Sequence, residues 1–567
     1  MHTLSAAGTE LDEIPSYVHL HVARGAKFTD PEGEPTYYEN FVQIQRFKRN
    51  IRIAHHFRDD PQKRRVATFR RAKLTPCWNP PLDQELERKL RMLDARFRAL
   101  HTTSTRPRKR DWLDDKARRW LRMRPHLCVV DTDKNLGDII CERLLIERLA
   151  LQQLRAGFLE VSSDESAAIV CRTSSALELL TVRALHIGCM RKQQADFVRS
   201  GLARTKIGTF RISVKLHKTP VKGRPLCNSL GTNIEFFALF LHEELQPLIK
   251  YHQTIACSTD DVIQDLRTLR VPAGFSIKTF DVVNLYPSID RRKLYSSLLD
   301  VLADHFDPMK AQFLVHGLQV VIEGTVVTFA GKCFQCKDGL PTGISPSCTA
   351  ANLMLVAFDR YMAANLGDQL LYYRRYIDDI ISIDSVAVDH FAKVADAWHE
   401  CISLDFTGQT FDDQHVVYLD LELYVAAGEV IWEMHEKPLA QHLYVPWASG
   451  HSTASKIATA IGCYKRIARR FKYHDGKMIA AQHRLLQRLR RRGYPKAAIH
   501  AAKLRSMCSA RSRDRDDVRR VVVRMKQQNK ARQIRKLFAG VNATVSWAQG
   551  TCNFIRRYNS VWRRSGG

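Results

Sequence analysis

The sequence predicts an α+β fold in which an antiparallel sheet carries helices on one of its sides. Three segments favour this fold class. Residues 274–286 (GFSIKTFDVVNLY) are rich in β-branched and aromatic residues, and residues 369–384 (QLLYYRRYIDDIISID) form two such runs around a short turn, as in a hairpin. Residues 348–366 (CTAANLMLVAFDRYMAANL) are apolar on nearly every face, which predicts a buried helix. Strands of one sheet interleaved with such a helix indicate an α+β arrangement.

Further elements lie on both sides of this centre. Residues 84–100 predict an amphipathic helix with Asp83 as its N-cap. Its apolar residues recur on one face, at Leu86, Leu90, Leu93 and Phe97. Residues 210–218 alternate as a strand before a turn marked by Gly and Pro, and residues 415–435 predict a strand pair that turns at Ala427 and Gly428. From residue 455 onwards the pattern is helical and basic.

Charge is distributed very unevenly along the chain. A chain of 567 residues exceeds what one hydrophobic core usually holds, so several subdomains are expected. The formal net charge is +29, which indicates a polyanionic partner. Residues 451–567 hold 30 Lys and Arg against 4 Asp, whereas residues 271–450 hold 12 basic and 23 acidic residues. An acidic centre between basic ends suits a metal site flanked by segments that bind nucleic acid.

Nothing in the sequence indicates export or a membrane span. Glu10, Asp12 and Glu13 occupy the region where a signal peptide requires apolar residues, and no run of about 18 apolar residues occurs. The 14 cysteines lack the spacing of a disulfide framework, which favours reduced thiols. Cys333 and Cys336 have zinc-like spacing but no second pair at a matching distance. We therefore expect a protein of the nucleus or cytoplasm that is not secreted.

Three carboxylates are candidates for metal binding. Asp378 and Asp379 stand side by side at the predicted hairpin turn, where a solvated turn is the ordinary explanation. Asp281 ends the strand at 274–281, and the hairpin could lie beside it. Carboxylates this close repel one another unless cations lie between them, and they suit two Mg²⁺ ions roughly 3.5–4 Å apart. The carbonyl of Val282 could complete the coordination. One ion would activate a 3′-hydroxyl and the other would stabilise a pyrophosphate leaving group.

Three segments around these carboxylates resemble a known family. FDVVNLYPSI (280–289), GLPTGISPSCTAANLML (339–355) and YRRYIDDI (373–380), in this order, resemble the palm motifs of reverse transcriptases. The family they resemble most is that of Penelope-like elements, relatives of telomerase reverse transcriptases. Further segments of that family are similar to DTDKNLG (131–137), VKLHKTPVKGRPL (214–226), VVYLDLELY with MHEKPL (416–439) and LRRRGYP (489–495). The resemblance covers most of the chain, from residue 128 to residue 500.

The resemblance implies the domains of a right-hand polymerase. A basic, partly helical N-terminal extension would occupy residues 1–127, and the fingers with the upstream region residues 128–270. The antiparallel-sheet palm with the catalytic carboxylates would occupy residues 271–450. A basic helical thumb and C-terminal tail would occupy residues 451–567.

The resemblance also implies roles for single residues. Asp281 and Asp378 would be the chief Mg²⁺ ligands, with Asp379 as an auxiliary ligand and Mn²⁺ as an alternative metal. Tyr286 corresponds to the aromatic residue that crowds the sugar 2′ position and so favours deoxynucleotides, although packing against the sheet is its ordinary alternative. Arg224 corresponds to the fingers arginine that binds the incoming triphosphate.

Other positions match the family pattern less closely. Lys215 and Lys218 are weaker candidates for the triphosphate, because exposed lysines beside a strand usually serve solubility. Gly343 would let the backbone approach the nucleotide and the template base. Thr342 departs from the pattern, since Penelope-like elements usually have Met there and retroviral enzymes Gln. We expect a structural role for His217.

The function that the resemblance implies is that of a retroelement's RNA-directed DNA polymerase. Its partners would be an RNA template, a DNA primer, their hybrid and dNTPs, with basic thumb residues on the phosphates. No GIY-YIG endonuclease motif occurs, which suggests a group that uses existing 3′ ends or a truncated copy. The alternative is a domesticated nucleic-acid-binding protein with an inactive palm. The complete carboxylate set argues for activity.

Overall fold

The structure is a computed structural model of the chain. It describes residues 3–4, 14–25, 28, 41, 44–45, 48–49, 51–52, 80–100, 112–133, 137–216, 220–398, 404–409, 415–437 and 440–507. The chain divides into two compact units, each assembled from segments that are distant in the sequence. Unit 1 combines Met1–Arg143 with Gln441–Arg466 and Ile479–Gly567, and unit 2 combines Leu144–Ala440 with Ile467–Met478. Neither coincides with one of the four predicted domain ranges, which stay a prediction.

The centre of unit 2 is a four-stranded antiparallel sheet. Its strands are β10 (Leu370–Tyr376), β11 (Asp379–Asp384), β7 (Ser276–Val282) and β12 (Leu404–Gln409), in that spatial order. The predicted hairpin at residues 369–384 is confirmed, with β10 and β11 as its arms. The expected strand at 274–286 ends earlier, because β7 stops at Val282 and a short helix, α11 (Leu285–Ser288), follows.

Two helices cover one face of this central sheet. They are α14 (Ser347–Leu366), which confirms the predicted buried helix, and α15 (Val388–Asp396). Phe280 of β7 stacks on Phe391 of α15 with ring centroids 4.4 Å apart. Alternate residues of a strand point to opposite faces, so the neighbours of Phe280 along β7 face away from these helices.

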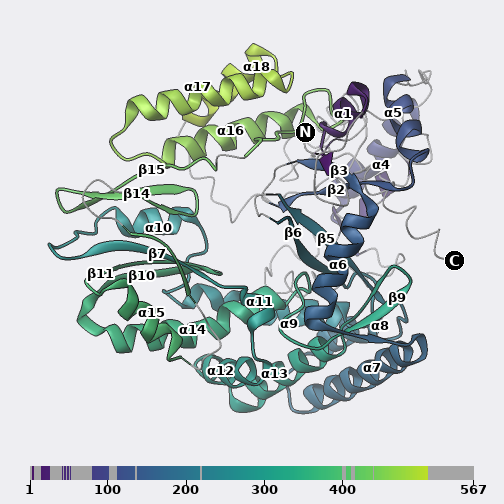
Figure 1. Cartoon of the computed structure of the whole chain (residues 1–567). Helices are drawn as coiled ribbons and strands as arrows, with labels where there is room; N and C mark the ends of the chain where they lie inside the picture. The colour runs from purple at the N-terminus through teal and green to yellow at the C-terminus, as the bar shows by residue number, and fades with distance from the viewer. Residues whose placement is uncertain are drawn as a thin grey trace. The chain divides into compact units, whose positions relative to one another are not determined.

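The opposite face of the central sheet is also covered. Helix α10 (Thr259–Leu266) packs there with a three-stranded sheet of β13 (Val416–Tyr418), β14 (Leu421–Ala426) and β15 (Glu429–Met434). The shared core includes Ile277, Ile381, Ile383, Val262, Leu266, Leu421 and Trp432. Figure 1 shows α10 on the side of the sheet opposite α14 and α15. The prediction of helices on one side only is therefore wrong, because both faces of these strands carry apolar residues.

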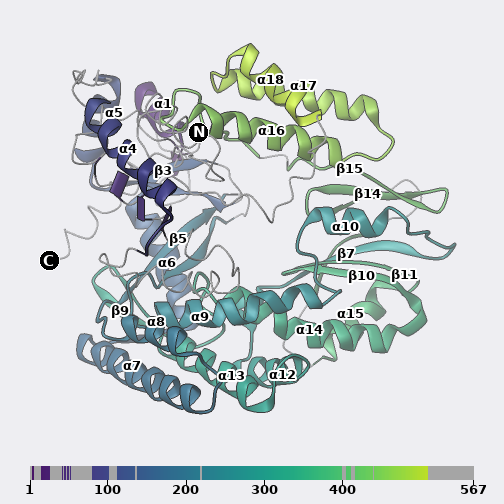
Figure 2. The ribbon, with the colours of Figure 1, turned by 180° about the vertical axis from the view of Figure 1, so that it is seen from behind.

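A second sheet in unit 2 has five strands. Their order is β4 (Phe158–Val161), β9 (Lys332–Cys336), β8 (Val326–Phe329), β5 (Gly208–Lys215) and β6 (Lys222–Asn228). Neighbours are antiparallel except β5 and β8. The remaining helices of the unit are α6 (Arg143–Gly157), α7 (Ser163–His186), α8 (Lys192–Leu202), α9 (Glu235–Leu245), η3 (Gln246–Tyr251), α12 (Arg291–Ala303), α13 (Pro308–Glu323) and η4 (Gly367–Gln369). Among them α7, α8, α9 and α13 pack against one another (Figure 2).

The zinc-like cysteine pair does not form a chelate. Cys333 and Cys336 lie three residues apart on β9, so their side chains point to opposite faces of the strand. The Cys336 Sγ instead accepts a hydrogen bond from the Arg291 guanidinium at 3.2 Å. The cysteines in the described part of the chain carry free thiols.

Unit 1 contains the elements of the N-terminal region. Those whose bounds fall within the described residues include β1 (Thr3–Leu4), α1 (Ser16–Val22), α4 (Gln84–Leu100), α5 (Trp112–Arg122), β2 (Leu127–Asp131) and β3 (Asp138–Glu142). The predicted cap of α4 is confirmed, since the Leu86 amide donates to Asp83 Oδ1 at 2.8 Å. Leu90 and Leu93 are buried, and the side chain of Phe97 lies outside the described residues.

The predicted helical character of the last part of the chain is confirmed as far as it is described. Its helices are α16 (Thr453–Arg469), α17 (Asp475–Arg491) and α18 (Lys496–Met507). The described helices include none whose length and apolar character would suffice to cross a membrane.

Candidate metal and nucleotide site

The three predicted carboxylates come together at one end of the central sheet. Strand β11 pairs with β7 in a register that sets Asp379 opposite Asp281. Asp378 lies in the two-residue turn between β10 and β11 rather than on the hairpin strand. One oxygen of each carboxylate lies within 4.8 Å of the others, and each side chain is partly buried. Within the described part of the chain, no other three potential metal ligands converge in this way.

This donor set fits Mg²⁺. Hard divalent cations prefer carboxylate oxygens, and three negative charges at this spacing repel one another without a cation among them. Asp281 and Asp379 come from paired strands, so the sheet register fixes their separation, and the turn adds the carboxylate of Asp378. The carbonyl of Val282 as a further ligand stays a prediction.

The turn that carries Asp378 has an unusual backbone. Ile377 has φ 60°, a conformation that β-branched residues rarely adopt. Left-handed non-glycine residues are strained by about 1–3 kcal/mol and persist where surrounding contacts hold them. The Val282 amide donates to the Asp378 carbonyl at 2.9 Å, and the Tyr418 hydroxyl donates to the Asp379 carbonyl at 3.3 Å. Neighbouring strands therefore hold both the turn and the start of β11.

Tyr286, which follows Asp281 in the same motif, interacts electrostatically with Asp378 and with Arg224 of β6. Burial raises the pKa of the Tyr286 hydroxyl, and a hydrogen bond with Cys348 and the negative charge of Asp378 raise it further. The Arg224 guanidinium acts in the opposite direction on the same pKa. The hydroxyl of Tyr286 thus lies within electrostatic reach of both Asp378 and Arg224.

The β5–β6 hairpin presents a row of basic residues. Arg224 is exposed and lies two residues from Lys222 on β6, so the two share a face. Lys222 lies directly opposite Lys215 of β5. The alternate residues Ile212 and Val214 are buried on the other face. Lys222 was not a candidate from the sequence, although its two-residue spacing from Arg224 on a strand predicts that the two share a face.

Some predicted positions cannot be placed. The described residues do not include His217, Lys218 or residues 134–136 of the upstream motif.

The loop containing Thr342 and Gly343 ties Tyr286 to β6. The Leu340 amide donates to the Tyr286 carbonyl at 2.8 Å, and the Cys227 amide of β6 donates to the Thr342 carbonyl at 2.7 Å. Gly343 has φ +105°, and a Cβ there would lie 2.5 Å from the Cys227 carbonyl oxygen. Close approach to β6 therefore accounts for the glycine. Contacts of Gly343 and Thr342 with a nucleotide stay a prediction.

Gly343→Ala is expected to destabilise unit 2, because the new Cβ meets the backbone of Cys227 and the left-handed φ disfavours alanine. Such incompatible substitutions cost more than about 1 kcal/mol. The matched control is Gly462→Ala in α16, where a Cβ has no neighbour within 4 Å. That variant should be stabilised by up to about 1 kcal/mol, since alanine favours a helix interior. Thermal unfolding measures both, and equal melting temperatures would contradict this packing argument.

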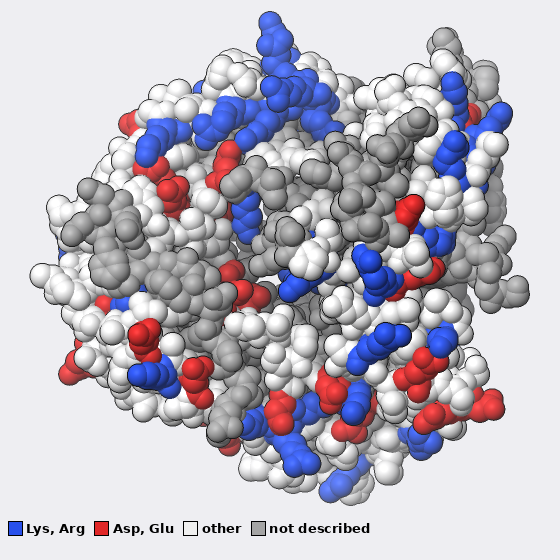
Figure 3. Space-filling view, viewed as in Figure 1, with Lys and Arg blue, Asp and Glu red and all other residues white. Residues whose placement is uncertain are grey.

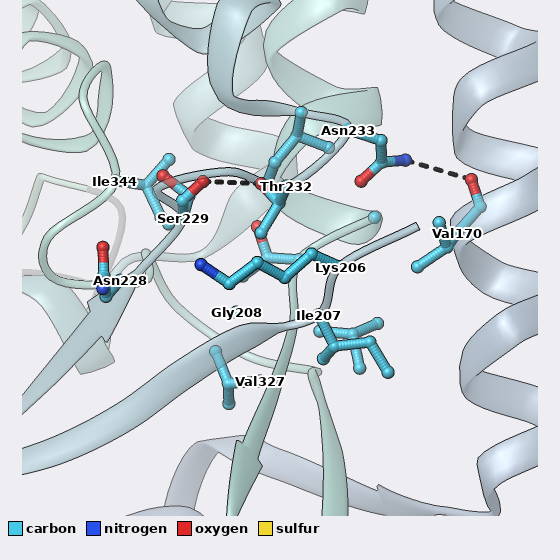
Figure 4. A pocket seen from close by; sticks show the side chains of 14 residues that line it. Val170, Lys206, Ile207, Gly208, Asn228, Ser229, Thr232, Asn233, Val327 and Ile344 are labelled. Atoms are coloured by element: carbon cyan, nitrogen blue, oxygen red, sulfur yellow. Dashed lines mark hydrogen bonds between the residues drawn. The ribbon is translucent and has the colours of Figure 1, made fainter. Parts of the chain in front are cut away.

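A separate pocket lies between β5, β8 and the segment after β6 (Figure 4). Polar groups around it are engaged within the protein. Lys206 Nζ donates to the Leu230 carbonyl at 2.7 Å, and Asn233 Nδ2 donates to the Val170 carbonyl at 3.0 Å. The three carboxylates do not line it, so it is distinct from the candidate metal site.

Basic side chains gather over α17 and α18 (Figure 3). The exposed residues of this basic surface are Arg484, Arg490, Arg491, Lys496 and Arg505. Helix α17 buries Ala481, Leu485 and Leu489 on its apolar face. That face anchors the helix, while the charges stay accessible to a polyanion.

Comparisons with known proteins give structural similarity alone. No protein family and no curated protein matches the sequence. Similar solved structures include telomerase from Candida albicans in complex with a TWJ fragment of telomeric RNA, at 10% identity over 75% of this chain and 73% of that chain, with a TM-score of 0.44. Apo telomerase from Candida tropicalis aligns over 85% of this chain and 98% of its own, at 10% identity and a TM-score of 0.40. These TM-scores are too low to transfer fold or function to this chain.

Proposed function

We propose that this protein is an RNA-directed DNA polymerase of a retroelement, which adds deoxynucleotides to a primer 3′-hydroxyl. The observation that supports it most strongly is the convergence of Asp281, Asp378 and Asp379 within 4.8 Å at a strand end and its adjoining turn. The order of the sequence motifs, which resemble those of Penelope-like elements, supplies the reaction class.

Each residue of the site has a role in this proposal. Asp281 and Asp378 hold Mg²⁺, and Asp379 assists them. Mg²⁺, when bound, would lower the pKa of the primer 3′-hydroxyl and neutralise negative charge on the transferred phosphate. Tyr286 restricts space beside the sugar, and Arg224 binds the phosphates of the incoming dNTP.

Primer extension tests the proposal. The purified chain is incubated with poly(rA), annealed oligo(dT), dTTP and Mg²⁺, and the products are resolved by length. We expect extension that depends on the RNA template and on the metal. Binding of the primer–template without any extension would favour the alternative, an inactive nucleic-acid-binding protein.

Basic residues of α17 and α18 are proposed to contact phosphates of the primer–template duplex. Each phosphate contact contributes about 0.7–0.9 to the slope of log affinity against log salt concentration. The triple variant Arg490→Gln, Arg491→Gln and Lys496→Gln should therefore flatten that slope by about 2 to 3. Fluorescence anisotropy with labelled primer–template at several salt concentrations measures it.

The control for this experiment removes the same charge elsewhere. Arg172, Arg183 and Lys192 are exposed residues of α7 and α8. Replacing all three by Gln gives a protein with the same net charge as the first triple variant. An equal loss of slope in both proteins would mean that α17 and α18 have no special part in binding.

A further inference from the structure

Arg375 is a fully buried cation three residues before Asp378. Its side chain is 0% exposed, and so is that of Asp359 on α14. The guanidinium Nε and Nη2 donate to the two carboxylate oxygens of Asp359, each at 2.9 Å. Nη1 donates to Asn352 Oδ1 at 2.9 Å and Nη2 to the Asn352 carbonyl at 3.1 Å. Burial acts to lower the pKa of Arg375, but Asp359 raises it overall, so the cation stays charged.

Asp359 accepts hydrogen bonds from other side chains as well. The Tyr373 hydroxyl donates to its Oδ1 at 2.9 Å, and Thr254 Oγ1 donates to its Oδ2 at 2.8 Å. A bidentate pair with further hydrogen bonds is rigid, because each partner has its orientation fixed. The network therefore holds the guanidinium of Arg375 in one place.

One hydrogen bond of Arg375 reaches the turn of the metal site. Its Nη1 also donates to the carbonyl of Ile377 at 3.0 Å. Ile377 is the left-handed residue that opens the turn, and Asp378 follows directly. This hydrogen bond constrains the peptide group between Ile377 and Asp378.

The same helix also connects to Tyr286. Asn352 Nδ2 donates to the Sγ of Cys348 at 3.8 Å, and Cys348 is hydrogen bonded with the Tyr286 hydroxyl. Helix α14 thus places polar side chains against both the turn and the tyrosine of the site.

Stability alone does not explain this buried pair. Desolvation of two ions is costly, and replacing a buried pair by well-packed neutral groups is often neutral or stabilising. We propose that Arg375 is a positioning residue, which together with Asp359 and Asn352 fixes the Ile377 carbonyl and thereby orients Asp378 for metal binding. This inference rests on the proposed function of the carboxylate cluster.

The test neutralises both members of the pair. The double variant Arg375→Met with Asp359→Asn leaves no unpaired buried charge, and the amide oxygen introduced at position 359 still accepts a hydrogen bond. We expect a melting temperature close to that of the wild type but an Mn²⁺ affinity about 10–100-fold weaker, the usual effect of losing a residue that orients a metal ligand. Mn²⁺ binding is measured by electron paramagnetic resonance, and primer extension is measured in parallel.

The central sheet offers a matched control. Lys278 and Asp384 form a second buried ion pair, with side chains 1% and 0% exposed. Asp384 ends β11, about 16 Å along the strand from Asp379 at about 3.3 Å per residue. The double variant Lys278→Met with Asp384→Asn should keep the Mn²⁺ affinity of the wild type, because that pair does not touch the turn.

A single substitution gives a second readout that keeps the buried charge. Arg375→Lys preserves the ion pair with Asp359 but lacks the fork that reaches Asp359, Asn352 and Ile377 together. We expect weaker Mn²⁺ binding and a lower kcat for extension, with the KM for dTTP little changed. Mn²⁺ affinity equal to that of the wild type in folded Arg375 variants would overturn the positioning role.

The proposed function can fail separately from this inference. Loss of Mn²⁺ binding in Asp378→Asn, together with full binding in the Arg375 variants, would support the metal site and reject the positioning role. Equal Mn²⁺ binding by wild type and Asp378→Asn would reject the metal site itself, and the inference with it.

Discussion

Asp378→Asn is expected to reduce nucleotide addition by about three orders of magnitude or more. Positioned metal ions contribute several kcal/mol to the stabilisation of such transition states, and about 4 kcal/mol corresponds to roughly a thousandfold in rate. The substitution removes one metal ligand but keeps the shape of the side chain. It also relieves repulsion among the three clustered carboxylates, so the variant should fold and bind primer–template normally.

The rate of single-nucleotide incorporation under single-turnover conditions measures this effect. The control is Asp368→Asn, which removes an exposed carboxylate from η4, just before β10. It should extend primers at the wild-type rate. A rate for Asp378→Asn within about tenfold of the wild type would contradict the assignment of the carboxylates to catalytic metal ions, since the expected loss is several kcal/mol.

Tyr286→Ala is expected to admit ribonucleotides. Removing the ring opens space where a 2′-hydroxyl would lie, and steric discrimination of this size is worth roughly 10–200-fold. The ratio of kcat/KM for UTP and dTTP on poly(rA) should therefore rise by roughly 10–200-fold. Use of dTTP alone should change less, because deoxynucleotides do not occupy that space.

Tyr286→Phe separates the ring from the hydroxyl. It keeps the bulk of the side chain and removes the hydrogen bond with Cys348. The nucleotide ratio should stay at its wild-type value if the ring excludes the 2′-hydroxyl. An unchanged ratio in a folded Tyr286→Ala variant would make Tyr286 a packing residue.

Local patterns predicted individual helices, caps and hairpins well. The cap at Asp83, the buried helix that became α14 and the hairpin around Asp378 all depend on short-range signals such as periodicity and turn residues. The motif order also indicated that Asp281 and the Asp378–Asp379 pair meet. The structure adds the register, with Asp379 directly opposite Asp281.

Long-range contacts escaped prediction. Arg375 and its neighbour Arg374 look alike in the sequence, yet Arg375 faces α14 and pairs with Asp359, while Arg374 pairs with Asp265 of α10. The two arginines differ because consecutive residues of a strand point to opposite faces, and both faces of this sheet are covered by other elements. A signal was present in Asp359, a charged residue inside an otherwise apolar helix, because a buried carboxylate requires a partner. The left-handed backbone of Ile377 could not be predicted from its residue type, because isoleucine rarely adopts a positive φ.

The central claim is that the three carboxylates hold the metal ions of template-directed DNA synthesis. A crystal structure of the protein with an RNA template, a DNA primer, a non-hydrolysable dNTP and Mg²⁺ tests it most directly. The account predicts two Mg²⁺ ions roughly 3.5–4 Å apart between Asp281 and Asp378, with the triphosphate bound at the same ions. A triphosphate bound elsewhere, with no metal ion on these carboxylates, would contradict it.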